Sequence, residues 1–303
     1  MELLNVFTNN LLPIILLSGA GFLLGWAVKL DSRPVGRVIF YILSPVLIFD
    51  LLTTSKLAIA SILLMMAYAL SVMAIVTAIA FVIGLLFHLP RPAMLAVVLT
   101  SLFSNNGNYG LPLIAFAFGQ DALAYASIYF VTNSLLLYTV GVLIASLGHL
   151  RLRDALLGLL KVPAIYAILL AVIFIQTGWS LPGPLQKTVT LTAGGAVPAM
   201  LILLGLELRK VEWTNDLKAL SIPVICRLLI GPLVGVGLAA IFGLNPAARK
   251  DGIIDAAMPS AVMTTVLANE YQLDSSLITA IVFISTILSP LTLTPLLYLL
   301  GRG

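Results

Sequence analysis

Residues 58–87 form an uninterrupted run without a single charged side chain. A helix of about 20 apolar residues crosses a bilayer, whereas a membrane barrel strand needs only about 10 residues of alternating pattern. The whole chain of 303 residues is 61% hydrophobic and 9% charged, against about 25% charged for a soluble domain. A water-soluble fold cannot bury so much apolar surface, so we expect an all-α membrane protein embedded in a lipid bilayer.

Ten apolar segments are separated by short polar turns. The third and tenth exceed the length of a single crossing, which predicts that they tilt or bend, and Pro290 and Pro295 give the tenth a reason to bend. We therefore expect ten transmembrane helices. Their approximate ranges are 8–28, 36–54, 58–87, 93–118, 122–147, 155–177, 185–208, 218–242, 250–269 and 274–300.

The chain repeats itself at a constant offset of 153 residues. Each half contains five apolar segments, an odd number, so the second half enters the bilayer from the opposite side. We expect two inverted five-helix repeats, 1–150 and 151–303, with their boundary at the polar turn 151–154. The matches pair Gly25-Trp26 with Gly178-Trp179, Pro45 with Pro198, Gly84 with Gly237, Asp121 with Asp274, and Phe130 with Phe283.

Lys and Arg are distributed unevenly between the two sides of this arrangement. With the N-terminus outside, ten fall on the cytoplasmic side and five on the outer side, and cytoplasmic loops generally carry the excess. We therefore expect a multi-pass protein of the plasma (inner) membrane with both termini outside. The net charge of +4 then reflects topology rather than a nucleic-acid partner. The cytoplasmic set is Lys29, Arg33, Arg37, Arg91, Arg151, Arg153, Lys161, Arg209, Lys210 and Lys218.

A polar, glycine-rich stretch at 105–112 lies between two apolar runs and ends at Pro112. Inside a membrane, irregular backbone is tolerated only where protein or a water-filled cavity satisfies its N–H and C=O groups. The 153-residue offset places Asn106 opposite Pro259, so we expect the fourth and ninth helices both to be broken and to cross. Half-helix N-termini meeting at the crossing would suit an anion such as a carboxylate.

The side chains at the two breaks are mainly amides and hydroxyls without net charge. They could contact a substrate, or they could cap the broken ends and hydrogen-bond one another. Beyond the breaks, a cation lies near the middle of the eighth segment. The residues that we expect to bind substrate are Asn105, Asn106, Gly107, Asn108, Tyr109, Pro112, Pro259, Ser260, Thr264 and Arg227.

The two breaks also resemble a known family. The run 105–113, Asn-Asn-Gly-Asn-Tyr-Gly-Leu-Pro-Leu, closely resembles the Asn-Thr-Gly-x-x-Gly-x-Pro-Leu motif of bacterial members of the auxin efflux carrier family. Residues 256–262, followed by 267–271, look like that family's ninth-span signature. The resemblance covers essentially the whole chain, and it extends to the related bile acid, arsenite and riboflavin transporter superfamily.

This resemblance implies a scaffold domain made of spans 1, 2, 6 and 7 and a moving transport domain made of spans 3–5 and 8–10. It also implies elevator-type alternating access and a homodimer. Substrates in the family are organic anions, indole-acetic acid in plants and malate or malonate in bacteria. The chain departs from the plant carriers at Ser104, where they place a proline, and at Ser260, where they usually have Gln. The plant substrate preference is therefore not carried over.

Three ionisable residues within the apolar segments are functional candidates, because such residues are costly in a bilayer. Arg227 could neutralise a substrate carboxylate, pair with an acid, or contact the carbonyls of the broken helices. Asp255 lies one turn after Asp251 and one turn before Pro259, as a candidate proton or cation site or a solvated vestibule acid. Asp50 is the second coupling candidate, with an ion pair to Lys56 as the alternative.

Together these patterns predict a secondary active transporter for small organic anions such as mono- or dicarboxylates, driven by the substrate gradient, protons, sodium or the membrane potential. A sodium-coupled bile-acid-type symporter or a cation–proton antiporter would share crossed, broken helices. A non-transporting membrane receptor would bind without flux. No HExxH, Walker A, GxSxG or paired-cysteine pattern occurs, and Cys226 is the single cysteine, so we expect no enzyme activity, metal site or cofactor.

Overall fold

The computed structural model describes residues 2–55, 57–146 and 162–301. In these ranges the regular structure is helical, apart from one isolated antiparallel bridge. Short π-helical turns, labelled η, connect several helices. The elements of the first half are α1 (Glu2–Val6), η1 (Phe7–Leu11), α2 (Leu12–Val28), α3 (Ser32–Val38), η2 (Ile39–Leu43), α4 (Ser44–Ser55), α5 (Ile59–Leu86), α6 (Arg91–Leu102), η3 (Asn106–Gly110), α7 (Leu111–Leu136), η4 (Leu137–Gly141) and α8 (Val142–Ala145).

The second half continues after the range 147–161. The expected boundary between the repeats at 150/151, with its turn 151–154, lies outside the described residues, as does Lys56. The elements are α10 (Pro163–Thr177), α11 (Gly183–Leu208), α12 (Leu217–Ile225), η5 (Cys226–Ile230), α13 (Gly231–Ile241), α14 (Pro246–Ala256), α15 (Met263–Glu270) and α16 (Ser275–Gly301).

Seven helical stretches of the described residues are long and apolar enough to cross a membrane, which bears out the expected helical membrane class. Two shorter apolar helices, α6 and α10, accompany them. The expected ten transmembrane helices stay a prediction. The seven stretches are Glu2–Val28, Ser32–Ser55, Ile59–Leu86, Asn106–Ala145, Gly183–Leu208, Leu217–Ile241 and Ser275–Gly301.

Helix α7 contains a sharp bend that its length conceals. Gly119 has φ 75° and ψ −162°, a backbone conformation that glycine adopts readily because it has no Cβ. The bend divides the stretch from Asn106 onward into two helical parts. It coincides with the short gap that separates the apolar segments 93–118 and 122–147 in the sequence.

The prolines of α16 do not end the helix, which runs through both of them from Ser275 to Gly301. A proline removes one main-chain donor and so frees the carbonyl four residues earlier. The Ser289 hydroxyl donates to the freed Thr286 carbonyl at 2.8 Å, which compensates for the missing N–H of Pro290.

Helices α2 and α11 pack backbone against backbone. A Cβ placed on Gly205 would lie 1.8 Å from the Ser18 main-chain oxygen, and one placed on Gly21 would lie 2.3 Å from that of Ile202. Close approach of small residues is a common way to pack helices in membranes, where no hydrophobic effect drives helices together. Helix α4 contacts both α10 and α11, so these elements and α2 form a continuous group.

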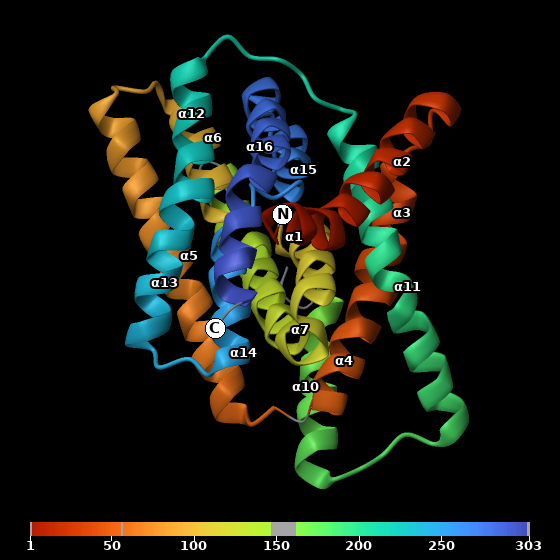
Figure 1. The fold of residues 1–303 in the computed structure, drawn as a ribbon. Helices are drawn as coiled ribbons and strands as arrows, with labels where there is room; N and C mark the ends of the chain where they lie inside the picture. Colours follow the sequence, from red (N-terminus) through yellow and green to blue (C-terminus); the bar gives the residue numbers. More distant parts are fainter. Residues whose placement is uncertain (1, 56, 147–161, 302–303) are drawn as a thin grey trace.

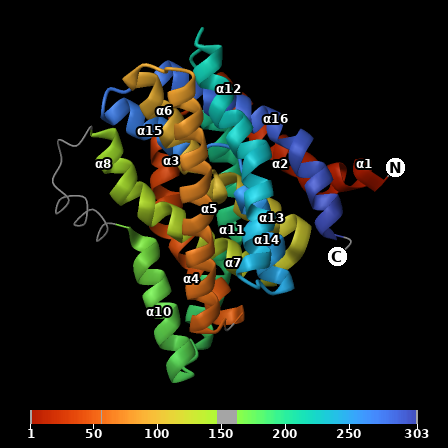
Figure 2. The same cartoon turned by 90° about the vertical axis from the view of Figure 1, so that its left-hand side faces the viewer.

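The turns between helices gather at two opposite ends of the molecule. The turns α2–α3 and α5–α6 and the linker from α11 to α12 lie at the top of Figure 1, and the turns α10–α11 and α13–α14 lie at the bottom. The termini lie on one side in Figure 2, where α1 contacts α16 and the Tyr298 hydroxyl donates to Glu2. Many large apolar side chains face outward between the two ends, as lipid contact requires; Leu191 is 81% exposed and Ile241 is 78% exposed.

Candidate functional site

The two expected interruptions of helical structure meet in the interior. Helix α6 ends at Leu102 and α14 ends at Ala256, and an extended segment follows each. Ser104 and Ser260 form the isolated antiparallel bridge of the described residues. The Asn105 N–H donates to the Pro259 carbonyl at 2.8 Å, and a bond of 2.8 Å from the Ala261 N–H to the Phe103 carbonyl completes the pairing. The broken backbones thus satisfy part of each other's hydrogen-bonding need, as burial in a membrane demands.

A helical segment begins on the far side of each break. Asn105 stands at the N-cap of η3, which runs into α7, and Val262 stands at the N-cap of α15. The first N–H groups of a helix have no intrahelical acceptor and carry partial positive charge. No side-chain hydrogen bond caps either N-terminus. Two uncapped half-helix N-termini therefore flank the paired extended segments. Such an arrangement can bind an anion.

Two asparagine side chains at the breaks can still form hydrogen bonds with a ligand. The Asn105 side chain is 4% exposed, and its Nδ2 has no hydrogen-bond partner among the described residues. Asn108 is the one residue of 105–112 that is partly exposed. A buried amide donor without an acceptor costs free energy, so Asn105 Nδ2 is poised to donate to a ligand.

The other polar residues of the crossing are engaged with protein. Asn106 donates to the Asp255 carbonyl at 3.2 Å and accepts from the Ser104 hydroxyl. Ser260 Oγ donates to the Thr100 carbonyl at 2.8 Å. Thr264 Oγ1 donates to the Ala261 carbonyl at 2.6 Å. These bonds hold the two breaks in register, which is the capping alternative considered for them above.

Three further expected site residues have packing roles. The Tyr109 hydroxyl and Ser289 Oγ of α16 are hydrogen-bonded at 3.0 Å, and the Tyr109 ring is buried. Pro112 is the second residue of α7, directly after the π-helical turn η3, and it removes one main-chain donor from this continuous helix. Gly107 has no room for a side chain, because a Cβ there would lie 2.6 Å from the Phe130 ring.

Arg227 binds the opposite ends of the broken helices. Its side chain is fully buried, and Nε donates to the Met258 carbonyl at 3.1 Å. Nη1 and Nη2 donate to the carbonyls of Ser101 at 3.4 Å and Asp255 at 3.5 Å. Carbonyls at a helix C-terminus carry partial negative charge, so the guanidinium neutralises the ends of α6 and α14 together. Of the roles considered from sequence, contact with broken-helix carbonyls is the one that the geometry displays.

The two coupling candidates lie in different surroundings. Asp255 is fully buried beside the crossing, one helical turn from the equally buried Asp251. All four of their carboxyl oxygens lack a donor among the described residues. Asp50 instead lies on α4, where its Oδ1 accepts from Gln186 of α11 at 3.3 Å. The structure therefore brings Asp255, and not Asp50, to the breaks.

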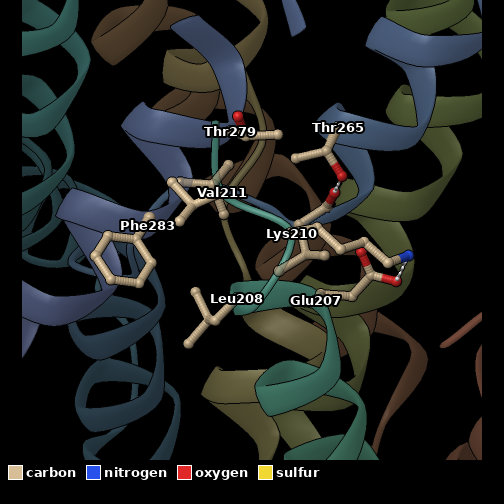
Figure 3. Close-up of a pocket in the computed structure, with 9 residues that line it drawn as sticks. Glu207, Leu208, Lys210, Val211, Thr265, Thr279 and Phe283 are labelled. Carbon is tan, nitrogen blue, oxygen red and sulfur yellow. Dashed lines mark hydrogen bonds and ion pairs between the residues drawn. The ribbon is translucent and has the colours of Figure 1, made fainter. Parts of the chain in front are cut away.

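A narrow crevice lies beside the break between α14 and α15 (Figure 3). Its walls come from the end of α11, from the following linker, and from α15 and α16; they include Leu208, Val262, Thr265 and Phe283. The crevice encloses about 10 Å³, close to the minimum for a single water. An organic anion therefore cannot enter by this route unless α15 and α16 separate from α11.

Several residues at the site were not singled out from sequence. Asn133 donates to the Ser104 carbonyl at 3.0 Å, and the buried Tyr129 hydroxyl lacks a partner among the described residues. Asp251 was noted only for its spacing from Asp255. The sole sequence signal for Asn133 is an amide within an apolar run, and Tyr129 carries none. Among the described residues no group of three or more His, Cys, Asp or Glu could hold a metal ion.

Long apolar helices, with two of them interrupted and paired in the interior, define a multi-pass membrane transporter. The chain belongs to the family described as membrane transport protein, whose match spans residues 6–297. This is the family of the auxin efflux carriers, so the resemblance noted from the two motifs is confirmed. Its members are transporters rather than enzymes.

Relatives of known name agree with this class. An "Uncharacterized transporter" of Methanothermobacter thermautotrophicus is 28% identical over 94% of this chain and 96% of its own length. "Auxin efflux carrier component 8" of Arabidopsis thaliana is 28% identical over 43% of this chain and 38% of its own length. A "Putative malonate transporter" of Rhizobium meliloti is 24% identical over 66% of this chain and 65% of its own length.

Proposed function

We propose that this protein is a secondary active transporter for small organic anions such as mono- and dicarboxylates. The observation that carries the proposal is the pair of uncapped half-helix N-termini at the breaks, next to the unpartnered Asn105 Nδ2. This constellation offers N–H donors and partial positive charge without a fixed cation. The names of an auxin carrier and a malonate transporter among the relatives support a carboxylate as the ligand.

In this proposal the substrate carboxylate lies at the N-termini of η3 and α15. Asn105 and Asn108 donate hydrogen bonds to it, while Ser260 and Thr264 hold the second break in place. Arg227 does not contact the substrate, since its nitrogens already bind three main-chain carbonyls. It acts instead as the clamp that keeps the helix ends together.

Transport proceeds by alternating access of elevator type. The scaffold consists of α1–α4, α10 and α11, and the moving part consists of α5–α8 and α12–α16, in two inverted five-helix repeats of ten crossings with the fourth and ninth crossed. The tight packing of α2 on α11 supports a rigid scaffold, and contacts of η3 with α11 put the site against its face. The proposal includes a homodimer in the plasma membrane with both termini outside.

Transport by purified protein in proteoliposomes tests the site. We expect uptake of radiolabelled malonate, or of another carboxylate from a panel of mono- and dicarboxylates. Hydrogen bonds to a charged group contribute about 1.5–3 kcal/mol each, so Asn105→Leu and Asn108→Leu should each weaken binding by about ten- to hundredfold. Asn9→Leu, at an exposed position of η1, is the matched control and should leave uptake unchanged. Equal uptake by all three variants would remove the breaks from the substrate path.

A further inference from the structure

Asp251 and Asp255 form a buried acidic pair that the proposed substrate contacts do not use. They lie one turn apart on α14, and neither side chain is exposed. None of their four carboxyl oxygens has a partner with hydrogen-bond geometry among the described residues, and the neighbouring Asn106 amide donates to the Asp255 main-chain carbonyl. The Tyr129 hydroxyl of α7, a helix that packs against α14, is also fully buried and has no partner among the described residues. Three unsatisfied polar groups therefore converge at one place.

Both acids cannot be ionised there. Adjacent carboxylates without donors in a buried place repel each other and lose their hydration. One of them must therefore be neutralised by a proton or a metal cation. The buried cation Arg227 donates its hydrogen bonds to main-chain carbonyls and none to the two carboxyl groups. One positive charge therefore still has to be supplied to the pair.

The groups that face the pair leave a proton as the fitting occupant. Tyr68 of α5 donates to the Gly235 carbonyl at 3.0 Å, and Tyr109 of η3 is bound to Ser289. Lys250, on the same helix, lies over the Phe118 ring at 5.8 Å. Helix α13 has no titratable side chain within Gly231–Ile241, and Tyr298 of α16 is bound to Glu2. The two acids lie one helical turn apart on α14, on the same side of the helix, where a carboxyl–carboxylate hydrogen bond requires one shared proton and no further ligand.

The pair is connected directly to the first helix break. The Asp255 carbonyl accepts from Asn106 Nδ2 at 3.2 Å, next to Asn105. A Cβ placed on Gly110 would lie 2.8 Å from Asp255 Oδ1, so this carboxyl group touches the backbone of η3. An anion at the N-terminus of η3 would therefore be repelled by an ionised pair. Binding of the anion favours protonation of the pair, and by linkage protonation strengthens binding of the anion to the same extent.

We propose that Asp251 and Asp255, beside Tyr129, are a proton-binding site that takes up one proton when an organic anion binds at the helix breaks. This inference rests on the proposed function and names the coupling ion. The anion and the proton then move together, so the protein is a proton–anion symporter. The pair never contacts the substrate, and its role is to set the charge against which the substrate binds.

Infrared difference spectra of the full-length protein without substrate, recorded between two pH values, test the pair alone. We expect the C=O stretch of a protonated carboxyl group near neutral pH in the wild-type protein. The band should be lost in the double variant Asp251→Asn/Asp255→Asn and retained in the control Asp121→Asn, which changes an exposed acid of α7. A wild-type protein without this band at any pH in the neutral range would overturn the proposal.

Calorimetric titration with malonate tests the linkage. Between about pH 6.5 and about pH 8.5, above the range in which free carboxylic acids titrate, the wild-type affinity should fall by up to about tenfold per pH unit. Titrations in buffers of different ionisation enthalpy should give little proton uptake where the free pair already holds its proton, rising toward one proton per malonate as the pH rises and the free pair loses that proton. The double variant, if folded by size-exclusion chromatography, should bind malonate with an affinity independent of pH; if it does not fold, the single variant Asp251→Asn takes its place.

The failures can be told apart. Malonate binding that is independent of pH in the wild type overturns the proton site and leaves the anion transporter standing. Affinity that depends on sodium at constant pH, and loses this dependence in the variant, overturns it in favour of a sodium site. Absence of binding and flux for the whole carboxylate panel rejects the proposed function, while the infrared band still decides whether the pair holds a proton.

Discussion

Arg227 joins the ends of two broken helices through three main-chain carbonyls. Replacement by Met would leave three buried carbonyls without a donor and two helix ends without a counter-charge. We expect Arg227→Met to lower stability by about 3 kcal/mol or more, because each unsatisfied buried acceptor costs about 1–3 kcal/mol. Arg227→Lys keeps the charge but not the planar fork, so it should lose less. Thermal unfolding in detergent measures both.

The same pair of variants tests the alternative role for Arg227. If Arg227→Met unfolded at the wild-type temperature but no longer bound malonate, and Arg227→Lys restored binding, the guanidinium would be a substrate ligand. We expect instead that Arg227→Met lowers the unfolding temperature, and that it weakens malonate binding only because the two breaks separate.

Helix α11 contains glycines in two opposite situations. A Cβ on Gly205 would meet the Ser18 main-chain oxygen at 1.8 Å, whereas one on Gly194 would have no neighbour within 4 Å. We expect Gly205→Ala to cost about 1–3 kcal/mol or more through overpacking, because main-chain atoms cannot move aside as a flexible side chain can. Gly194→Ala should raise stability by about 0.5–1 kcal/mol, the ordinary gain of Ala over Gly in a helix. Unfolding in mixed detergent micelles compares them, and an equal effect of both changes would contradict backbone-to-backbone packing of α2 on α11.

At this scale the sequence is a good guide to where helices stop. Pro259 and the glycines of 105–112 predict the interruptions that the structure has after Leu102 and Ala256. The offset between Asn106 and Pro259 predicts that the two interruptions belong together, and their main chains pair. These features follow from local backbone chemistry, which is legible in a single chain.

The partners of buried side chains are not legible in the same way. For Arg227 the sequence left a substrate, an acid and the carbonyls of the broken helices open as partners, and only the fold selects the carbonyls, which carry no residue-specific signal. Tyr129 lies in an ordinary apolar run and comes to Asp251 and Asp255 only because α7 folds against α14. Asp50 was a coupling candidate with an ion pair to Lys56 as the alternative, and the packing of α4 on α11 brings it to Gln186. Each case depends on tertiary packing rather than on neighbours in sequence.

At the scale of the whole molecule, the crevice beside the break between α14 and α15 marks the surface along which the proposed scaffold and moving part meet. It separates the end of α11 from α15 and α16, and Figure 3 shows Leu208 and Phe283 on its wall. With about 10 Å³ of space, this crevice, which we call the seam between the two proposed parts, is closed in the state described by the structure. Elevator motion requires the two sides of the seam to slide, while binding at the breaks requires only a local opening.

Cross-linking across this seam separates transport from binding. In a Cys226→Ser background, Leu208→Cys together with Phe283→Cys would place one thiol on α11 and one on α16, on either side of the crevice. After reaction with a short bifunctional thiol reagent, we expect malonate flux in proteoliposomes to be lost and to return when a cleavable linker is cut. Malonate binding that survives the cross-link would show that the breaks are also reached by a route other than this crevice, which the cross-link holds closed. Each single cysteine variant, treated with the same reagent, is the control and should retain flux. Full flux after complete cross-linking would mean that α16 does not move against α11, and it would exclude the elevator motion across this surface.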